Sequence, residues 1–87
     1  MNQAFLRIHP KDNVLAALRD IDKGEVIDFE GTSFTSAERI PAKHKFTFTD
    51  FAQGDQIFQY GVLVGETTKP ISKGERISME NCVHASM

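Results

Sequence analysis

An imidazole, a carboxylate and an amide stand close together in the segment Ile8–Val14, which reads IHPKDNV. His9 and Asp12 are three positions apart around Pro10, so a turn here would bring the two side chains near each other. Such a pair can bind a metal ion or contact a substrate, with Asp12 orienting the ring. The alternative is an ordinary turn in which Asp12 and Asn13 serve only the backbone. The spacing leaves both interpretations open.

A second candidate for chemistry is the dipeptide His44-Lys45, which follows a proline at position 41 and stands where a strand is predicted to begin. An imidazole at the lip of a strand can act as a general base or hold a metal ion. The neighbouring ammonium group can bind an anion. The alternative is an exposed loop histidine, which the spacing alone favours.

Tyr60-Gly61 ends another predicted strand, at a place where the backbone must bend or meet another surface closely. The phenol could bond to a substrate, or it could fill the core with only its hydroxyl in water. Cys82 has no adjacent basic cluster and is predicted to be an unreactive thiol. His84, near the end of the chain, is predicted to have no role.

The chain length limits what these residues can do alone. Eighty-seven residues, of which 40% are apolar and 25% charged, suffice for one globular domain, residues 1–87. So short a chain cannot by itself enclose a typical ligand pocket of about 300–1,000 Å³. We therefore expect another domain or subunit to supply part of any active site.

Charge and cysteine content exclude several classes of partner. Ten Lys and Arg face twelve Asp and Glu, and no basic run exists of the kind that nucleic acids require, so no nucleic-acid partner is expected. The longest apolar run, Val14–Leu18, is too short to span a membrane. One cysteine allows no internal disulfide, and Arg7 interrupts any signal-like start, so a cytoplasmic location is expected.

A degenerate repeat organises the chain. In each copy an apolar residue is followed by any two residues, a glycine, an acid, any residue and an isoleucine. The three copies are Asp20–Ile27, Asp50–Ile57 and Pro70–Ile77. Because glycine adopts positive φ without a Cβ clash, each copy is predicted to be a tight turn that leads the chain into a strand.

Strand signals dominate between the turns. Lys45–Thr49 alternates strictly, which predicts Phe inward and Thr or Lys outward. Asn13–Arg19 fits a helical turn or a strand, and the strand is favoured because the segment leads into the first repeat. A short helical turn is predicted at Ser36–Arg39. The other predictions are strands at Gln3–Ile8, Ile57–Tyr60, Val62–Gly65, Thr67–Thr68 and Ile77–Met79, and a hairpin end at Phe29–Phe34. Short strands separated by turns predict an all-β fold.

Four ordered motifs and a final asparagine carry a family resemblance. They are Ile8–Val14, Ile40–Lys45, Tyr60–Gly65, Ile71–Glu75 and then Asn81. Together they resemble the N-terminal domain of the altronate/galactarate dehydratase family, which is of the SAF type with a β-clip fold. The resemblance covers nearly the whole chain. Two departures bear on substrate identity: Lys43 replaces the usual glycine before His44, and the ending Cys82-Val83-His84 is atypical.

The resemblance implies a metal-dependent hydro-lyase that converts an aldonic or aldaric acid to a 2-keto-3-deoxy acid. A divalent ion, Fe²⁺ or Mn²⁺, would be held mainly by a large catalytic domain or subunit that this sequence lacks. His44 and Lys45 are the expected catalytic residues, and either His9 or His44 could add a metal ligand. The residues expected to contact the substrate are His9, Asp12, Asn13, Tyr60 and Gly61.

Three alternatives remain open at this point. The chain could be a non-catalytic SAF binding module, like the antifreeze-like domain of sialic acid synthases. It could be the small subunit of a sulfolactate sulfo-lyase, which removes sulfite instead of water. It could also be an interaction domain that only stabilises a larger assembly. The expected partners are the catalytic part and a sugar acid, with a homo-oligomer also compatible.

Overall fold

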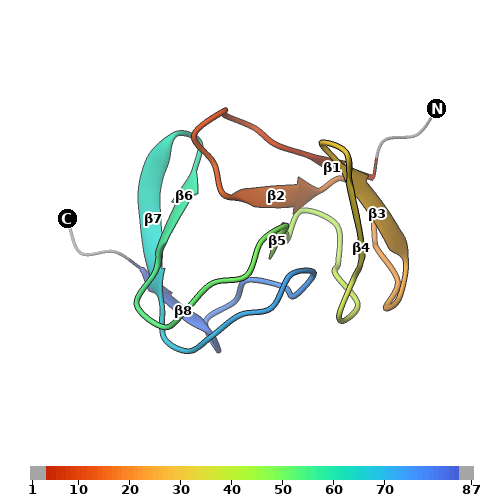
Figure 1. Ribbon diagram of the computed structural model, residues 1–87. Coiled ribbons are helices and arrows are strands. Elements are labelled where there is room, and N and C mark those ends of the chain that lie inside the picture. The colour runs from red at the N-terminus through yellow and green to blue at the C-terminus, as the bar shows by residue number, and fades with distance from the viewer. Residues whose placement is uncertain (1–3, 85–87) are drawn as a thin grey trace.

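Residues 4–84 are described by the computed structural model, and in them all regular structure is β (Figure 1). The prediction of an all-β fold is confirmed. The strands are β1 (Phe5–Leu6), β2 (Val14–Ala17), β3 (Val26–Phe29), β4 (Thr32–Thr35), β5 (Lys45–Thr47), β6 (Gln56–Gln59), β7 (Val62–Thr67) and β8 (Cys82–His84). They form three small antiparallel sheets, ordered β1-β2-β5, β3-β4 and β6-β7-β8. Within this part of the chain no helix is long and apolar enough to cross a membrane.

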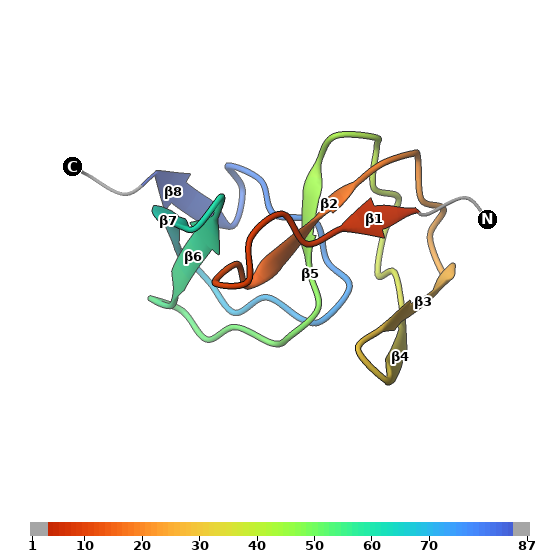
Figure 2. The same cartoon turned by 90° about the horizontal axis from the view of Figure 1, so that it is seen from above.

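Strand β2 lies between the two ends of an elongated molecule. The β6-β7-β8 sheet lies at one end and the β3–β4 hairpin at the other (Figure 2), and the molecule measures 39 × 22 × 22 Å. Val14 and Leu15, adjacent on β2, are buried in two different apolar clusters. Successive strand residues point to opposite faces, so β2 forms a wall of both clusters. Phe46 of β5 lies in the first cluster and Ile57 of β6 in the second.

The three repeat copies form the same turn, as predicted. Their glycines, Gly24, Gly54 and Gly74, have φ of 83°, 89° and 91°. In each copy the residue after the glycine donates its N–H to the carbonyl three positions earlier, and the glycine N–H donates to a segment that passes beside the turn. The accepting carbonyls belong to Ser36, which directly follows β4, to Thr67 of β7 and to Thr47 of β5.

Each turn therefore contacts one buried hydroxyl residue. Ser36 Oγ donates to the carbonyl of Asp22, and Thr67 Oγ1 donates to that of Ala52 at 2.6 Å. Thr47 is fully buried, and its hydroxyl donates to the carbonyl of Thr49. The prediction that Thr47 faces water is wrong, because this backbone partner satisfies its hydroxyl inside the fold.

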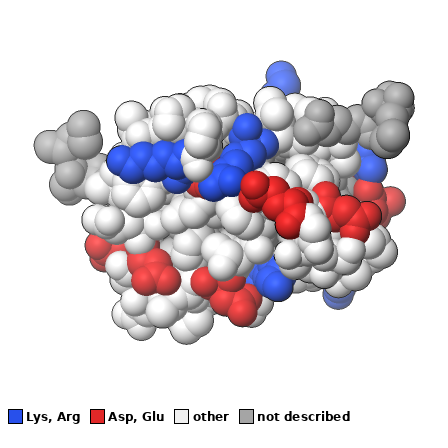
Figure 3. Space-filling model, turned by 45° about the horizontal axis from the view of Figure 1, so that its top comes forward, with Lys and Arg blue, Asp and Glu red and all other residues white. Residues whose placement is uncertain are grey.

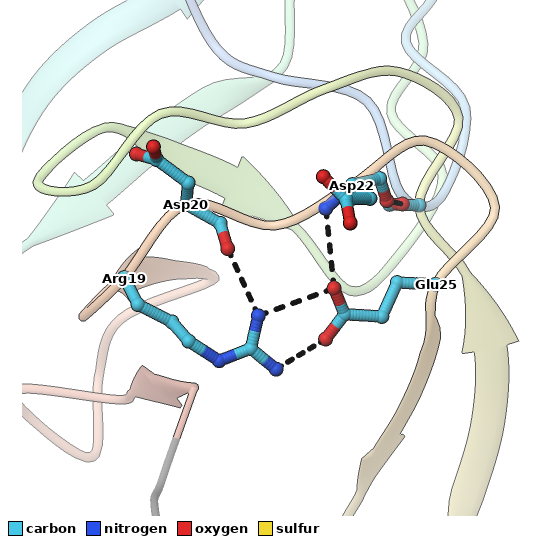
Figure 4. Close-up of polar contacts among 5 residues, drawn as sticks. Arg19, Asp20, Asp22 and Glu25 are labelled. Atoms are coloured by element: carbon cyan, nitrogen blue, oxygen red, sulfur yellow. Dashed lines mark hydrogen bonds and ion pairs between the residues drawn. The ribbon is translucent and has the colours of Figure 1, made fainter.

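The acid of the repeat stabilises its own turn. In the first copy, Glu25 Oε1 accepts the Asp22 N–H at 3.1 Å, and the carboxylate also pairs with the Arg19 guanidinium (Figure 4). Two hydrogen bonds lower the pKa of Glu25: the one from Arg19 has the larger effect, and the one from the Asp22 N–H has the smaller. In the second copy Asp55 accepts the Ala52 N–H at 2.7 Å. The acid is thus a turn cap as well as a surface charge.

Three local predictions differ from the structure. Ser36–Arg39 is a bend, because the N–H groups of Ser36 and Ala37 donate to the carbonyls of Glu25 and Gly74 rather than within a helical turn. Ile77–Met79 is not a strand; its chain turns at Met79, where the Asn81 N–H donates to the Ser78 carbonyl. The first strand is confined to Phe5–Leu6, and Gln3 lies outside the described residues.

Candidate functional site

The buried carboxylate of Asp12 ties together two turns that are far apart in the sequence. Its side chain is only 1% exposed. Oδ1 accepts the Gly61 N–H at 2.8 Å, and Oδ2 accepts the N–H groups of Tyr60 and His9, each at 3.1 Å. The Asp12 N–H donates to the His9 carbonyl at 2.9 Å, which closes the turn that the sequence allowed. Backbone donors to an ionised carboxylate are strong hydrogen bonds, so this contact fixes the geometry of both turns.

Asn13 extends the same contact to β6. Its Nδ2 donates to the Gln56 carbonyl at 2.8 Å, and its Oδ1 accepts the Phe58 N–H at 2.8 Å. The β6–β7 register shifts between Ile57 and Phe58, where a bulge interrupts the regular ladder. The amide of Asn13 therefore supplies both a donor and an acceptor to the backbone beside an irregular strand.

The imidazole of His9 lies directly against the main chain of Gly61. A Cβ added at Gly61 would come within 2.9 Å of three atoms of the ring. His9 Nδ1 accepts the Lys11 N–H at 3.0 Å, so in the neutral ring the proton resides on Nε2. The prediction that Asp12 orients the ring is wrong. Asp12 bonds to the His9 main chain, while Lys11 and Gly61 position the ring.

Tyr60 is displayed at the tip of the β6–β7 hairpin. Its side chain is 63% exposed, so the alternative of a core-filling phenol is wrong. Tyr60 and Gly61 have φ of 57° and 76°, the signature of a type I′ turn. A bulky residue in this left-handed region costs about 1 kcal/mol or more. Tyr60 is thus an exposed aromatic residue at a strained turn position, next in sequence to Gly61, against which the His9 ring packs.

The structure thus brings together five residues that the sequence singled out, which we call the clasp. The clasp consists of His9, Asp12, Asn13, Tyr60 and Gly61. Buried Asp12 and half-buried Asn13 and Gly61 hold the turns in place, and the exposed members, His9 and Tyr60, carry the imidazole and the phenol. Their contact with a substrate stays a prediction.

His44 lies at the other end of β2. Strands β2 and β5 pair antiparallel, with Val14 opposite Thr47 and Ala16 opposite Lys45, and the Ala17 N–H donates to the His44 carbonyl. Because β2 has four residues, its terminal Cα atoms are three steps, or about 10 Å, apart. His44 is exposed at the start of β5, as predicted for its position, but it does not join the clasp.

Lys45 lines a pocket of about 170 Å³ beside β8. The other lining residues are Val64, Ile77, Ser78, Met79, Cys82, Val83 and His84. Burial raises the pKa of the Cys82 thiol, and the charge of Lys45 offsets this in part, which agrees with the predicted unreactive thiol. Sequence reasoning missed this pocket, although the strand-forming residues before His84 gave a signal for β8.

Among the described residues, neither the charged side chains in Figure 3 nor the possible metal ligands gather in one place. On the face drawn in Figure 3, acidic and basic side chains lie next to each other. Among residues 4–84 no group of three His, Cys, Asp or Glu side chains is placed to hold a metal ion. His9 also has its Nδ1 engaged by Lys11. The residues present do not fit a complete metal site, so we derive no step through a metal.

The small antiparallel sheets and repeated glycine turns are those of a SAF-type β-clip domain. The chain belongs to the altronate/galactarate dehydratase SAF domain family, whose model matches residues 3–85. It is 39% identical to an altronate dehydratase of Bacillus subtilis (strain 168) over 79 residues, which are 91% of this chain and 16% of that protein. It is 30% identical to an altronate dehydratase of Escherichia coli (strain K12) over 77 residues, 88% of this chain and again 16% of the relative.

Proposed function

We propose that this chain is the SAF part of a hydro-lyase that removes water from a sugar acid of the altronate or galactarate type, giving a 2-keto-3-deoxy acid. A larger catalytic part, in the same polypeptide or a separate subunit, would complete the active site. The observation that carries this proposal is the family match over residues 3–85, together with relatives that are matched over only 16% of their length. The pocket of about 170 Å³ also falls below the usual size of a ligand site, about 300–1,000 Å³.

The exposed side of the clasp suits the carboxylate of a sugar acid. His9 offers an Nε2–H, and the Tyr60 hydroxyl offers a second donor from the adjacent turn. The Asp12 charge is buried and already compensated by three N–H groups, which keeps repulsion of an anion low. In this proposal His9 and Tyr60 contact the substrate, while Asp12, Asn13 and Gly61 hold them in place.

A catalytic role for His44 and Lys45 is the second half of the proposal. Dehydration needs a base for the proton beside the carboxylate and an acid for the departing hydroxyl. The exposed imidazole of His44 is suited to proton transfer, and Lys45 to binding an anion. The clasp and His44 lie at opposite ends of β2, about 10 Å apart along the strand, so the experiment below tests the two groups separately.

The remaining features follow from the family. The divalent ion, Fe²⁺ or Mn²⁺, would be held mainly by the catalytic part, because the described residues of this chain assemble no ligand set. When bound, such an ion would stabilise negative charge that develops beside the substrate carboxylate. The single cysteine fits a reducing compartment such as the cytoplasm.

A chimera tests the function directly. This chain would replace the matched segment of the Bacillus subtilis altronate dehydratase, and the consumption of altronate would be measured. We expect the chimera to dehydrate altronate and the isolated chain to be inactive. His9→Ala should raise KM by about tenfold, the loss of one charge-assisted hydrogen bond. His44→Ala should lower kcat by about 100-fold if it transfers a proton.

Lys23→Ala, at an exposed turn remote from both groups in sequence, is the control and should leave both constants unchanged. A folded chimera with no altronate dehydratase activity would overturn the proposed function. An active chimera in which neither histidine variant changes KM or kcat would leave the family role intact and remove both site assignments.

A further inference from the structure

We propose that the pocket beside β8 is a docking socket for the catalytic part of the enzyme, which inserts an apolar side chain flanked by a carboxylate. This inference rests on the proposed function. The β8 socket is defined by its lining residues, Lys45, Val64, Ile77, Ser78, Met79, Cys82, Val83 and His84.

The walls of the β8 socket do not suit a sugar acid. Val64, Ile77 and Val83 present aliphatic surface to the space. A sugar acid carries a hydroxyl on most of its carbons, and each hydroxyl buried without a partner costs about 1–3 kcal/mol. A space of about 170 Å³ with such walls instead fits an aliphatic or aromatic side chain.

The rim of the socket exposes apolar side chains that are costly to leave in water. Met79 is 86% exposed and Val83 is 52% exposed. Both line the socket, so the exposed surface is continuous with its walls. Methionine is unbranched and adapts to the shape of a partner, which makes it frequent at binding surfaces. A partner that covers this rim gains the burial of both side chains.

Charge defines the rest of the partner's chemistry. Lys45 is cationic, His84 can become so, and no acidic residue lines the socket. Among the ion pairs within residues 4–84, all four are formed by arginines, so Lys45 has no carboxylate of its own there. A carboxylate beside the inserted apolar side chain would pair with Lys45 and set its orientation; in this arrangement Lys45 binds the catalytic part, and His44 alone is left to contact the substrate at that end of β2.

A second copy of this chain fits the socket poorly. Two exposed apolar residues of the described chain stand next to an acid, Met79 before Glu80 and Val26 after Glu25. Met79 is itself part of the rim of the socket, and Val26 is 64% exposed. However, the Glu25 carboxylate is already paired with Arg19 and with its own turn. The relatives, in contrast, extend far beyond the 16% of their length that this chain matches. The occupant that we assign is therefore the catalytic part.

Hydrogen exchange tests the socket without relying on activity. The amides of β8 would be compared in the isolated chain and in the Bacillus subtilis chimera described above. We expect at least tenfold slower exchange in the chimera. Val83→Asp and Lys45→Glu should each remove most of this protection, because they oppose an apolar insertion and a carboxylate respectively. The matched control is Val26→Asp, an exposed valine outside the socket, which should leave the protection of β8 unchanged.

The outcomes separate the two proposals. Equal exchange in the isolated chain and in an active chimera would overturn the docking socket alone. A folded but inactive chimera whose β8 is protected would overturn the proposed function and still support docking.

Protection that is unaffected by Val83→Asp and Lys45→Glu would place the contact elsewhere and overturn the socket. Concentration-dependent dimers of the isolated chain that Val83→Asp abolishes would identify a second copy as the occupant and also overturn it. Thermal unfolding of the isolated variants verifies that they fold, and Lys45→Met serves as a milder variant.

Discussion

Two hairpins in this molecule have the same turn and different surroundings. Glu30-Gly31 connects β3 to β4, and Tyr60-Gly61 connects β6 to β7. In both, the two central residues have positive φ, 49° and 80° in the first and 57° and 76° in the second. A two-residue loop of this type matches the twist of the strands, and both hairpins follow a copy of the repeat at the same spacing.

The difference lies in what touches each turn. Around Gly31, a Cβ would find nothing within 4 Å, and Glu30 makes an exposed ion pair with Arg7 at 3.1 Å. Around Gly61, the His9 ring occupies the space above the backbone, and Asp12 accepts the N–H groups of both turn residues. Local sequence thus determines the turn, and tertiary contacts decide whether the turn becomes part of a candidate site.

Removing the Asp12 carboxylate should give the largest effect. Asp12→Ala leaves the N–H groups of His9, Tyr60 and Gly61 without their acceptor. Because Asp12 is buried, we expect a loss of about 2–4 kcal/mol in the free energy of unfolding, measured with urea. Asp12→Asn, which keeps one acceptor oxygen, should lose about half as much.

The matched change at the other hairpin is Glu30→Ala. It removes only an exposed ion pair, worth about 0–1 kcal/mol. Similar losses for Asp12→Ala and Glu30→Ala would show that the buried carboxylate does not distinguish the two turns.

The two glycines give the next largest difference. Alanine at either position must adopt positive φ, which costs about 1 kcal/mol in both hairpins. At Gly61 the new Cβ would also come within 2.9 Å of the His9 ring. We therefore expect Gly61→Ala to lose about 1–2 kcal/mol more than Gly31→Ala in the same unfolding experiment. A shift of the His9 ring resonances by NMR should accompany Gly61→Ala only; equal losses and an unmoved ring would contradict the contact.

Much of the fold was predictable from local pattern. The glycine spacing predicted three turns at Gly24, Gly54 and Gly74, because positive φ is a local demand that few other residues meet. Strand β2 was predicted because its segment leads directly into the first repeat turn. The bend after Ser36 was not predictable, because it depends on hydrogen bonds to Glu25 and Gly74, which are distant in the sequence. The hydroxyl of Thr47 bonds locally to Thr49, but its main chain pairs with the third turn, at Gly74 and Glu75, and local pattern does not encode that contact.

The candidate site divides in the same way. The sequence singled out His9, Asp12 and Tyr60 by residue type, and it left two roles open for Asp12, of which the structure shows the one that serves the backbone. The three backbone groups that Asp12 binds include two that lie 48 and 49 positions away. No short motif encodes that distance. The separation of His44 from the clasp follows from the β2–β5 register, which is also a tertiary fact.

The smallest expected effect concerns the residue type at the tip of each hairpin. Asparagine tolerates the left-handed region better than tyrosine or glutamate. Tyr60 is 63% exposed and packs little, so Tyr60→Asn should stabilise the isolated chain by about 0.5 kcal/mol. Glu30→Asn should change stability by no more than that, because the gain in the turn is offset by the lost pair with Arg7. In the chimera only Tyr60→Asn should raise the KM for altronate, because it removes the hydroxyl that the proposed function places on the substrate. If Tyr60→Asn stabilises the chain and leaves KM unchanged, the phenol does not bind the substrate, and the difference between the two hairpins is one of structure alone.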